Sequence, residues 1–549
     1  MADSRTLEIL DQQSQLENDR SVWDSHWQEV AELCLPRHDE FNVTRTEGAK
    51  RTDKIFDATA LLAIDRAASA VDSLITPSTM FWHGLGSMDE ALNEDLGIKQ
   101  YLEVITKILF KMRYRPAANF ASQAHECYVS LMAFGNDALF TDDVLGVGIR
   151  YKSCSMSEIF IAEDHAGIID LVHRRFPLTA RQAVQKFGED KIPERIKKDG
   201  EKYPFRKHQF IHCVRPNQEI KRGARDHRGM KYSSYYVAKD DKMMVSEGGY
   251  RTFPYAVGRH VTAPTETYGR SPAMMVLPDI KMVNEMEKTM IRAAHKIVDP
   301  PLLLYGDGVL SAFNARPNAL NYGGVNDQGV QLVVPLKTGS NLPIGIEMAD
   351  QKRKVINDAL YVTLFQILVQ NPQMTATEAL LRAQEKGQLL APTMGRQQSE
   401  FLERVITREL DIGSAAGVFP PMPEKLRRSG GEVKVVYTSP LSRLRRAEDG
   451  VAIMRTLEQV SMIAQVRPDV WDNFDDEAIA RELADINGMP AKTLRLPEIV
   501  AQVRAARKEA QAQAQQMEQT EQAARSFKAG AQGLQAAGVK IPQPQPEEV

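Results

Sequence analysis

The sequence predicts a mainly helical α+β protein, and three features lead to that fold class. Amphipathic helical patterns occupy both ends of the chain, whereas residues 138–260 alternate short β-branched and aromatic segments with turn residues. Between these regions, two long helical patterns flank an excursion rich in Gly, Pro and Asn. The 549 residues, of which 43% are hydrophobic and 26% charged, suffice for several folding units with buried cores.

Four helices are expected before the β-rich region. Residues 4–34 carry apolar side chains at helical spacing, and Pro36 ends that pattern. Asp57 can cap a second helix, because a carboxylate accepts hydrogen bonds from the first free backbone N–H groups. Two further helical patterns occupy about 94–113 and 117–134.

The segment from about 138 to 260 is expected to form antiparallel β-structure. Seven short runs rich in β-branched and aromatic residues are separated by turn residues, and one helix at 179–187 interrupts them. The runs are ALFTDDV, GIRYKSC, EIFIAED, GIIDLVHRRF, HQFIHCVRP, YYVAKD and FPYAVGRHV.

Two long helices with an excursion between them follow the β-rich region. The first is expected at 272–298, where Asp299-Pro300-Pro301 ends it, and the second at 346–369, before Asn371-Pro372. The excursion contains two apolar patches, PLLLY and VQLVVPL, which predict a small β-element. Helix breakers define both ends of this unit.

The last third of the chain is again mostly helical. A third long helix is expected to open at Met374 and to resume, after an interruption at 387–392, as far as about 411. A short strand is predicted at Glu432–Tyr437, three or four helices at 442–495, and an Ala- and Gln-rich helix from about 497.

The sequence lacks the common short motifs of ATPases, zinc proteases, serine hydrolases and cysteine-based metal sites. The chain has no G-x-x-x-x-G-K-[ST], H-E-x-x-H or G-x-S-x-G motif, and its four cysteines form no C-x-x-C pair. His125-Glu126-Cys127, His212-Cys213 and the carboxylates Asp475-Asp476 are better explained as ordinary core, surface and helix N-terminal residues. We therefore assign no catalytic, cofactor-binding or metal-binding residue, and we expect reduced, mostly buried cysteines.

Charge and hydropathy constrain the partners. A net charge of −3 is unusual for a protein that grips nucleic acid tightly, so any contact with DNA should be loose or local. The most apolar helical run, Ala359–Val369, is about half the length that crosses a bilayer. The polar N-terminus resembles no signal peptide, and we expect an intracellular protein without a membrane span.

One charge pattern stands out on the two long helices. Lys281, Lys288, Arg292 and Lys296 fall at i, i+7, i+11 and i+15, which places them along one side of the first helix. Lys352-Arg353 lies near the start of the second helix. Two interpretations remain open, a solvated face and a stripe that contacts a polyanion.

Two N-terminal motifs are similar to signatures of a known family. Trp23 followed by Leu35-Pro36 resembles a first helix that ends in Leu-Pro. Ile55–Ala60, continuing to Leu74–Ser78 and Phe81-Trp82, resembles "(Y/F)-D-(S/A)-T-A … L-T-P-(P/S) … W-F". Phe-Trp replaces the more usual Trp-Phe order, which puts the packing at that position in doubt.

Three C-terminal motifs follow in the same order. Met374–Glu378 resembles the family's M-T-A-T-E helix start, and Tyr437–Leu441 resembles its Y-x-S-P-L stretch. Asp475-Asp476 with Gly488–Pro490 is similar to its "D-x-D … G-x-P" region. Together, the motifs spread over residues 20–500 resemble the head-to-tail connector, or portal, family of T7-like podoviruses.

The resemblance implies a phage portal fold with a wing, stem, clip, crown and C-terminal helical barrel. The implied ranges are 1–270 for the wing (N-terminal helices and β-rich part), 271–298 for stem helix 1, 299–345 for the clip, 346–369 for stem helix 2, 370–440 for the channel loop and wing helix, 441–498 for the crown, 499–528 for the barrel helix and 529–549 for a flexible tail.

The resemblance also implies a function and its partners. About twelve subunits would form a closed ring at the portal vertex of a virion, assembled in the host cytoplasm, through which double-stranded DNA is packaged and ejected. Implied partners are the major capsid and scaffolding proteins, terminase, a tail adaptor and internal core or ejection proteins. No cofactor and no enzymatic activity are implied.

Two sets of site residues follow from this interpretation. The DNA-channel candidates are the stripe cations Lys281, Lys288, Arg292 and Lys296, with Lys352 and Arg353. The constriction-loop candidates are Asn371, Pro372 and Gln373, with Gly387–Arg396 as a rival because it also interrupts a helix.

Two other classes of function remain open at this point. A scaffold or internal-core protein of a phage would be mostly helical and charged, and would lack the β-rich middle. A nuclease or peptidase would need a site assembled from distant residues, which no motif here indicates.

Overall fold

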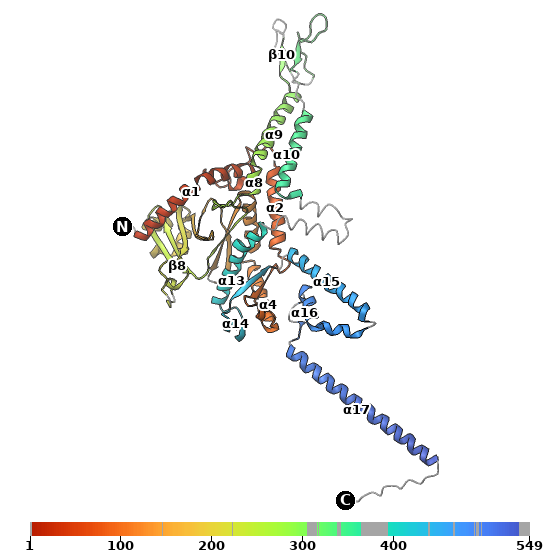
Figure 1. The fold of residues 1–549 in the computed structure, drawn as a ribbon. Helices are drawn as coiled ribbons and strands as arrows, with labels where there is room; N and C mark the ends of the chain where they lie inside the picture. Colours follow the sequence, from red (N-terminus) through yellow and green to blue (C-terminus); the bar gives the residue numbers. More distant parts are fainter. Residues whose placement is uncertain are drawn as a thin grey trace. The chain divides into compact units, whose positions relative to one another are not determined.

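The fold is described from a computed structural model (Figure 1). The structure describes residues 3–536 apart from 45, 145, 222, 225, 305–313, 315, 317, 337–341, 364–392, 438–439, 465–466, 488, 490–492 and 496. The chain divides into two compact units. The first unit comprises residues 1–85, 104–421 and 434–448, and the second comprises 86–103, 422–433 and 449–549. Helices make up more of the described chain than strands, as the sequence predicts.

The N-terminal helices lie where their patterns place them. The N-cap residue of the second helix is Ala58 and not the predicted Asp57, although the Asp57 carboxylate accepts a hydrogen bond from the Thr59 backbone N–H at 2.9 Å. The elements are α1 (Ser4–Cys34), η1 (Pro36–His38), α2 (Thr59–Ile75), β1 (His83–Ser87), α3 (Glu90–Asn93), α4 (Leu96–Arg113) and α5 (Phe120–Phe134).

The glycine that follows α5 fixes the entry into the β-rich region. Gly135 has φ +76°, and a Cβ there would lie 2.5 Å from the Gly269 carbonyl oxygen. Only glycine combines this left-handed backbone with so close an approach. α5 therefore ends here, and the chain turns directly into the first long strand.

The β-rich region forms two antiparallel sheets, as predicted. One has the strand order β3-β2-β9 and the other β4-β5-β6-β7-β8. β8 and the helix α7 were not predicted. The elements are β2 (Asn136–Val144), β3 (Gly148–Ser153), β4 (Ile159–Glu163), β5 (Ile169–Thr179), α6 (Ala180–Phe187), η2 (Glu189–Lys191), α7 (Glu194–Lys202), β6 (Lys207–Pro216), η3 (His227–Gly229), β7 (Tyr232–Ala238), β8 (Met243–Tyr250) and β9 (Tyr255–Arg259).

The five-stranded sheet is covered on both faces. On one face, Phe210 and Tyr236 pack with Phe187 of α6 and Ile196 of α7. Their strand neighbours point to the opposite face, where Ile9 of α1 packs against a cluster that includes Ile211, Cys213, Tyr235 and Val237. The alternation follows from the two-residue period of a strand.

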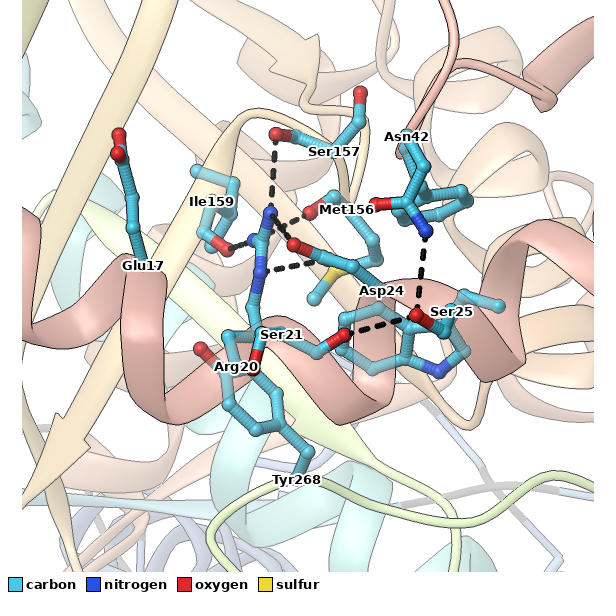
Figure 2. Close-up of polar contacts among 12 residues, drawn as sticks. Glu17, Arg20, Ser21, Asp24, Ser25, Asn42, Met156, Ser157, Ile159 and Tyr268 are labelled. Atoms are coloured by element: carbon cyan, nitrogen blue, oxygen red, sulfur yellow. Dashed lines mark hydrogen bonds and ion pairs between the residues drawn. The ribbon is translucent and has the colours of Figure 1, made fainter.

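A buried arginine anchors α1 to the loop that precedes β4 (Figure 2). Arg20 is 1% exposed, and its Nη1 donates to the carbonyl oxygens of Met156, at 2.8 Å, and Ile159. The Nε of Arg20 lies 2.9 Å from the Asp24 carboxylate, and the guanidinium stacks 3.7 Å from the Phe160 ring centroid. Charge, hydrogen bonding and stacking together fix α1 on the sheet.

Two long helices lie side by side after the β-rich region, and a small β-ribbon connects them (Figure 1). β10 and β11 pair antiparallel, with Leu303 opposite Val334, so the two apolar patches of the excursion form the expected β-element. The elements are α8 (Pro272–Met275), α9 (Leu277–Val298), β10 (Leu302–Leu304), β11 (Val333–Pro335) and α10 (Leu342–Ala359).

The second long helix begins four residues earlier than predicted and is interrupted at Leu360-Tyr361, after which residues 362–363 are again helical. A helix was expected at 346–369, but α10 begins at Leu342 and ends at Ala359. The left-handed backbone of Tyr361, with φ 61°, cannot continue a right-handed helix, and Leu360 and Val362 are instead buried. Residues 364–392 lie outside the described chain, as do the predicted start at Met374 and the interruption at 387–392.

The last helices lie in the regions that the sequence predicts to be helical, although some of their bounds differ from the predicted ones. Asp475 accepts hydrogen bonds from the backbone N–H groups of Glu477, at 2.9 Å, and Ala478, at 3.0 Å, which confirms that Asp475-Asp476 marks a helix start. The elements are η4 (Gln397–Leu402, a π-helical segment), α13 (Glu403–Ala415), α14 (Glu424–Arg428), β12 (Val433–Tyr437), α15 (Pro440–Ala464), η5 (Pro468–Asn473), α16 (Asp476–Ile486) and α17 (Pro497–Ala536).

The last helix extends beyond residue 528, the predicted end of the barrel helix, whereas the flexibility of the tail stays a prediction. α17 continues to Ala536, because the run after Lys528 is still rich in Ala and Gln, both strong helix formers. Residues 537–549 lie outside the described chain. Among the helices that the structure describes, none has the length and apolarity of a membrane span.

Candidate functional site

The six predicted channel cations lie on α9 and α10, and four of them form ion pairs with carboxylates of the same chain. Lys281 Nζ donates to Glu29 of α1 at 2.5 Å, and Lys288 Nζ donates to Glu285, one turn earlier in α9, at 2.8 Å. Both pairs are largely exposed, so each should contribute little to stability.

The two cations of α10 hold the helix pair together. Lys352 Nζ donates to Asp279 of α9 at 2.7 Å. Arg353 bridges three carboxylates, which are Asp57 before α2 at 2.8 Å, Glu287 of α9, and Asp350 at 2.8 Å. A planar guanidinium can bridge several acids at once, which suits it to a junction of three segments.

The same junction is reinforced by an amide. Asn284 of α9 is 7% exposed, and its Oδ1 accepts from the backbone N–H groups of Phe56, at 2.7 Å, and Asp57, at 3.2 Å. Its Nδ2 donates to the Lys54 carbonyl oxygen at 2.8 Å. The segment that precedes α2 is thereby tied to the side of α9.

The junction also fixes the charge states of its members. Burial lowers the pKa of Arg353, but hydrogen bonds to Asp350 and Asp57 outweigh burial and raise it above its usual value. Burial raises the pKa of Asp57, but hydrogen bonds from Thr59 and Arg353 outweigh that effect and lower it. Both groups therefore stay charged, and Arg353 has a structural role within the chain.

Arg292 and Lys296 differ from the other four cations. Both are exposed in the C-terminal half of α9, and no ion pair joins either of them to a residue that the structure describes. They continue the line of Lys281 and Lys288 along one side of the helix. Within the described chain, these two are the stripe residues whose charge is available to an external polyanion.

The constriction-loop candidates Asn371, Pro372 and Gln373 lie outside the described residues. Of their rival, Gly387–Arg396, only the last four residues are described, and they begin the helix that leads into η4. The position of a constriction therefore stays a prediction.

The histidine and cysteine clusters do not form a metal site in the described part of the chain. His212 is buried, stacks on Tyr236 with 4.0 Å between ring centroids, and lies 2.7 Å from the Tyr255 hydroxyl. His125 lies 3.7 Å from the Asp72 carboxylate. The four cysteines are free and buried, as predicted.

A buried ion pair that the sequence did not reveal joins α4 to α13. Arg113 Nε and Nη2 donate to the two carboxylate oxygens of Glu409 at 2.8 and 2.5 Å, and both side chains are at most 1% exposed. Tyr151 donates its hydroxyl hydrogen to the same carboxylate, and His83 Nε2 lies 2.9 Å from Arg113 Nη2. Burial, followed by the charge of Arg113, lowers the pKa of His83 well below its usual value, so His83 is neutral.

Comparison with known proteins identifies relatives over nearly the whole chain. The model of a family described as "Bacteriophage head to tail connecting protein" matches residues 7–494. The "Probable portal protein" of Bordetella phage BPP-1 is 27% identical over 518 residues, which cover 92% of each chain. The "Portal protein" of Salmonella phage epsilon15 is 25% identical over 524 residues, which cover 94% of this chain and 93% of the relative.

Solved structures give weaker similarities. A chain of the "Virion of native gene transfer agent (GTA) particle" matches 78% of this chain and 94% of its own length, at 11% identity and a TM-score of 0.36. A chain of the "Neck of empty GTA particle computed with C6 symmetry" matches 75% and 90%, at 11% identity and a TM-score of 0.33. These scores are too low to carry an argument about fold.

Proposed function

The chain belongs to the bacteriophage head-to-tail connecting protein family, and from this premise we propose that it forms the ring through which double-stranded DNA enters and leaves the capsid. The observation that carries the proposal is the family match over residues 7–494. This match favours a portal protein over a scaffold or internal-core protein. It also favours a structural role over an enzymatic one, because the family is one of structural portal proteins.

We propose that about twelve copies close the ring through a head-to-tail contact between unlike surfaces. In this arrangement α8 and α9 are the first stem helix, residues 299–345 are the clip, and α10 from Ile346 onward belongs to the second stem helix. The wing, crown and barrel keep their predicted order along the chain, with α17 as the barrel helix. Capsid and scaffolding proteins, terminase and internal core or ejection proteins are the proposed partners of the ring, which assembles in the host cytoplasm.

The tip of the clip is proposed to dock the tail adaptor. Large apolar side chains in the described part of the clip are strongly exposed, for example Leu320 at 79% and Tyr322 at 80%. Val325 and Val330 are also more than half exposed. Loops on a rigid support commonly carry binding, and exposed apolar groups favour association with a protein.

The proposed contact with DNA is weak and restricted to a few charges. The chain carries 69 basic and 72 acidic residues, so its composition gives no general attraction for phosphate. Tight binding would oppose the sliding of DNA, whereas isolated exposed cations make transient contacts that salt screens. Arg292 and Lys296 have the most suitable positions among the six predicted cations, since the other four are paired within the chain.

The double variant Arg292→Gln and Lys296→Gln should reduce the amount of DNA that packaged particles retain. It should not lower the melting temperature of the purified protein. Each contact is worth about 1 kcal/mol or less, but the change is repeated in every subunit. Retained DNA and melting temperature should be measured on the same preparation.

Replacing Lys281 and Lys288 with Gln is the matched control, because it removes the same charge from the same side of α9. Their carboxylate partners should make this variant nearly silent in DNA retention. If both variants retain DNA like the wild type, or if the control has the larger effect, the assignment of Arg292 and Lys296 to the channel is refuted.

A further inference from the structure

A cleft with a volume of about 510 Å³ opens beside the π-helical segment η4. Its walls come from the start of β5, the start of β7, the segment 251–253, β9 and the η4–α13 helix. None of its lining residues belongs to α9 or α10, so what the cleft binds is independent of the DNA-channel proposal. π-helical turns inside helices occur frequently at functional sites.

Basic side chains outnumber acidic ones in the lining of the cleft. Glu400 is already neutralised by Arg259, whose Nε and Nη2 donate to its two oxygens at 3.0 and 2.9 Å. Arg259 also pairs with Glu163. The remaining charged lining residues are Lys231, Arg251, Arg404 and Glu403, so three cations face one carboxylate.

Arg404 is the central cation of the cleft. It is half-buried, and its guanidinium lies 5.2 Å from the Phe253 ring centroid. Nη2 of Arg404 donates a hydrogen bond to the Ile169 carbonyl oxygen at 2.7 Å, and no ion pair joins Arg404 to a carboxylate of the described chain. A guanidinium has five N–H donors, so most of the donors of Arg404 remain available to a ligand.

The electrostatics of Arg404 agree with a cation that lacks a counter-ion. Burial lowers the pKa of Arg404, and the electrostatic effects of Tyr232, Glu400 and Asp170 only partly oppose this. By contrast, burial also lowers the pKa of Arg259, but hydrogen bonds to Glu400 and Glu163 outweigh it and raise the pKa above its usual value. Arg259 is thus paired with carboxylates of the chain itself, whereas Arg404 forms no ion pair within the described chain.

Part of the lining is apolar, beside the hydroxyl groups of Thr252, Ser399 and Thr407. Phe253 and Val257 are buried in the wall, and Ile168 is 55% exposed at the start of β5. A ligand that matches this surface carries an apolar side chain beside its negative charge. Nucleic acid does not match this surface, because its closely spaced phosphates would be repelled by the Glu403 carboxylate. They would also leave the apolar wall uncovered.

We propose that this cleft binds an acidic peptide segment of a partner protein, with a carboxylate on Arg404 and a neighbouring apolar side chain against Phe253 and Ile168. Lys231 and Arg251, both exposed, attract the approaching segment. A bidentate guanidinium–carboxylate contact gives the site its geometric selectivity.

Fluorescence anisotropy of the full-length protein with a fluorescein-labelled peptide containing Phe-Glu-Leu-Glu tests this proposal. We expect saturable binding, and a loss of about tenfold or more in affinity for Arg404→Met, which removes the charge but keeps an unbranched side chain. The same peptide with Gln in place of Glu should bind equally poorly to both proteins. Arg195→Met, an exposed arginine outside the cleft lining, is the matched control and should bind like the wild type.

Three results would overturn the proposal. These are no saturable binding of the acidic peptide, equal affinity for Arg404→Met and the wild type, and displacement of the peptide by a short DNA duplex at equal charge concentration. If Arg404→Met does not fold, the double variant Lys231→Gln and Arg251→Gln replaces it, since both side chains are exposed, and it should weaken binding in the same direction.

Discussion

Replacing Glu409 with Gln should lower the free energy of unfolding of the unit that contains it by about 3–5 kcal/mol. The change leaves the Arg113 guanidinium buried without a counter-ion, among aromatic rings that include Trp82, 4.5 Å from it. Tyr151 also loses a charged acceptor. The midpoint of urea denaturation, followed by aromatic fluorescence, measures the loss.

Two control variants separate the ion pair from general damage to α13. Glu403→Gln changes an exposed residue of the same helix and should have almost no effect. The double variant Arg113→Met and Glu409→Met removes both charges and should recover much of the stability, because apolar groups of similar volume can replace a buried pair. A silent Glu409→Gln would show that this pair does not stabilise the contact between α4 and α13.

Replacing residues 318–331 with a short Gly-Ser linker should abolish tail attachment while rings and DNA packaging persist. The deletion removes the exposed Leu320 and Tyr322 but keeps β10 and β11, so the helix pair below them retains its connection. Particles made in cells that express only the variant should appear under the microscope as filled or emptied heads without tails.

The matched control for this deletion keeps the loop and changes only its polar residues. Asp327→Ser and Gln328→Ser should leave tails attached, because both side chains are exposed and the proposed contact is apolar. If tails attach normally after the deletion, the docking site lies elsewhere. If no heads form at all, the segment acts in assembly and not in tail attachment.

The elements with the strongest local signals were predictable from sequence. Ser271-Pro272 and Asp299-Pro300-Pro301 marked the two ends of the first long helix, and runs rich in β-branched and aromatic residues located most strands of both sheets. α7 was missed because its charged sequence, with Gly200, offers little helical pattern, and it is Ile196 packing against Phe187 that favours the helix. The end of α10 was missed because the apolar run beyond Ala359 reads as helix, although Tyr361 adopts a left-handed backbone.

The contacts of the candidate site depend on residues far apart in the chain, and this limited the prediction. Glu29 and Asp57 neutralise Lys281 and Arg353, respectively, from 252 and 296 residues away. Nothing in the local sequence distinguishes Glu409, which is buried, from Glu403, which is exposed. The spacing of the cations was therefore predictable, whereas the identity of the free cations required the folded chain.

The mass and shape of the purified assembly test the central claim most directly. Light scattering combined with negative-stain microscopy should find closed rings with a central hole and a mass of roughly 0.7 MDa, from about twelve chains of 61.5 kDa. Monomers or dimers at every protein and salt concentration tested would contradict the account.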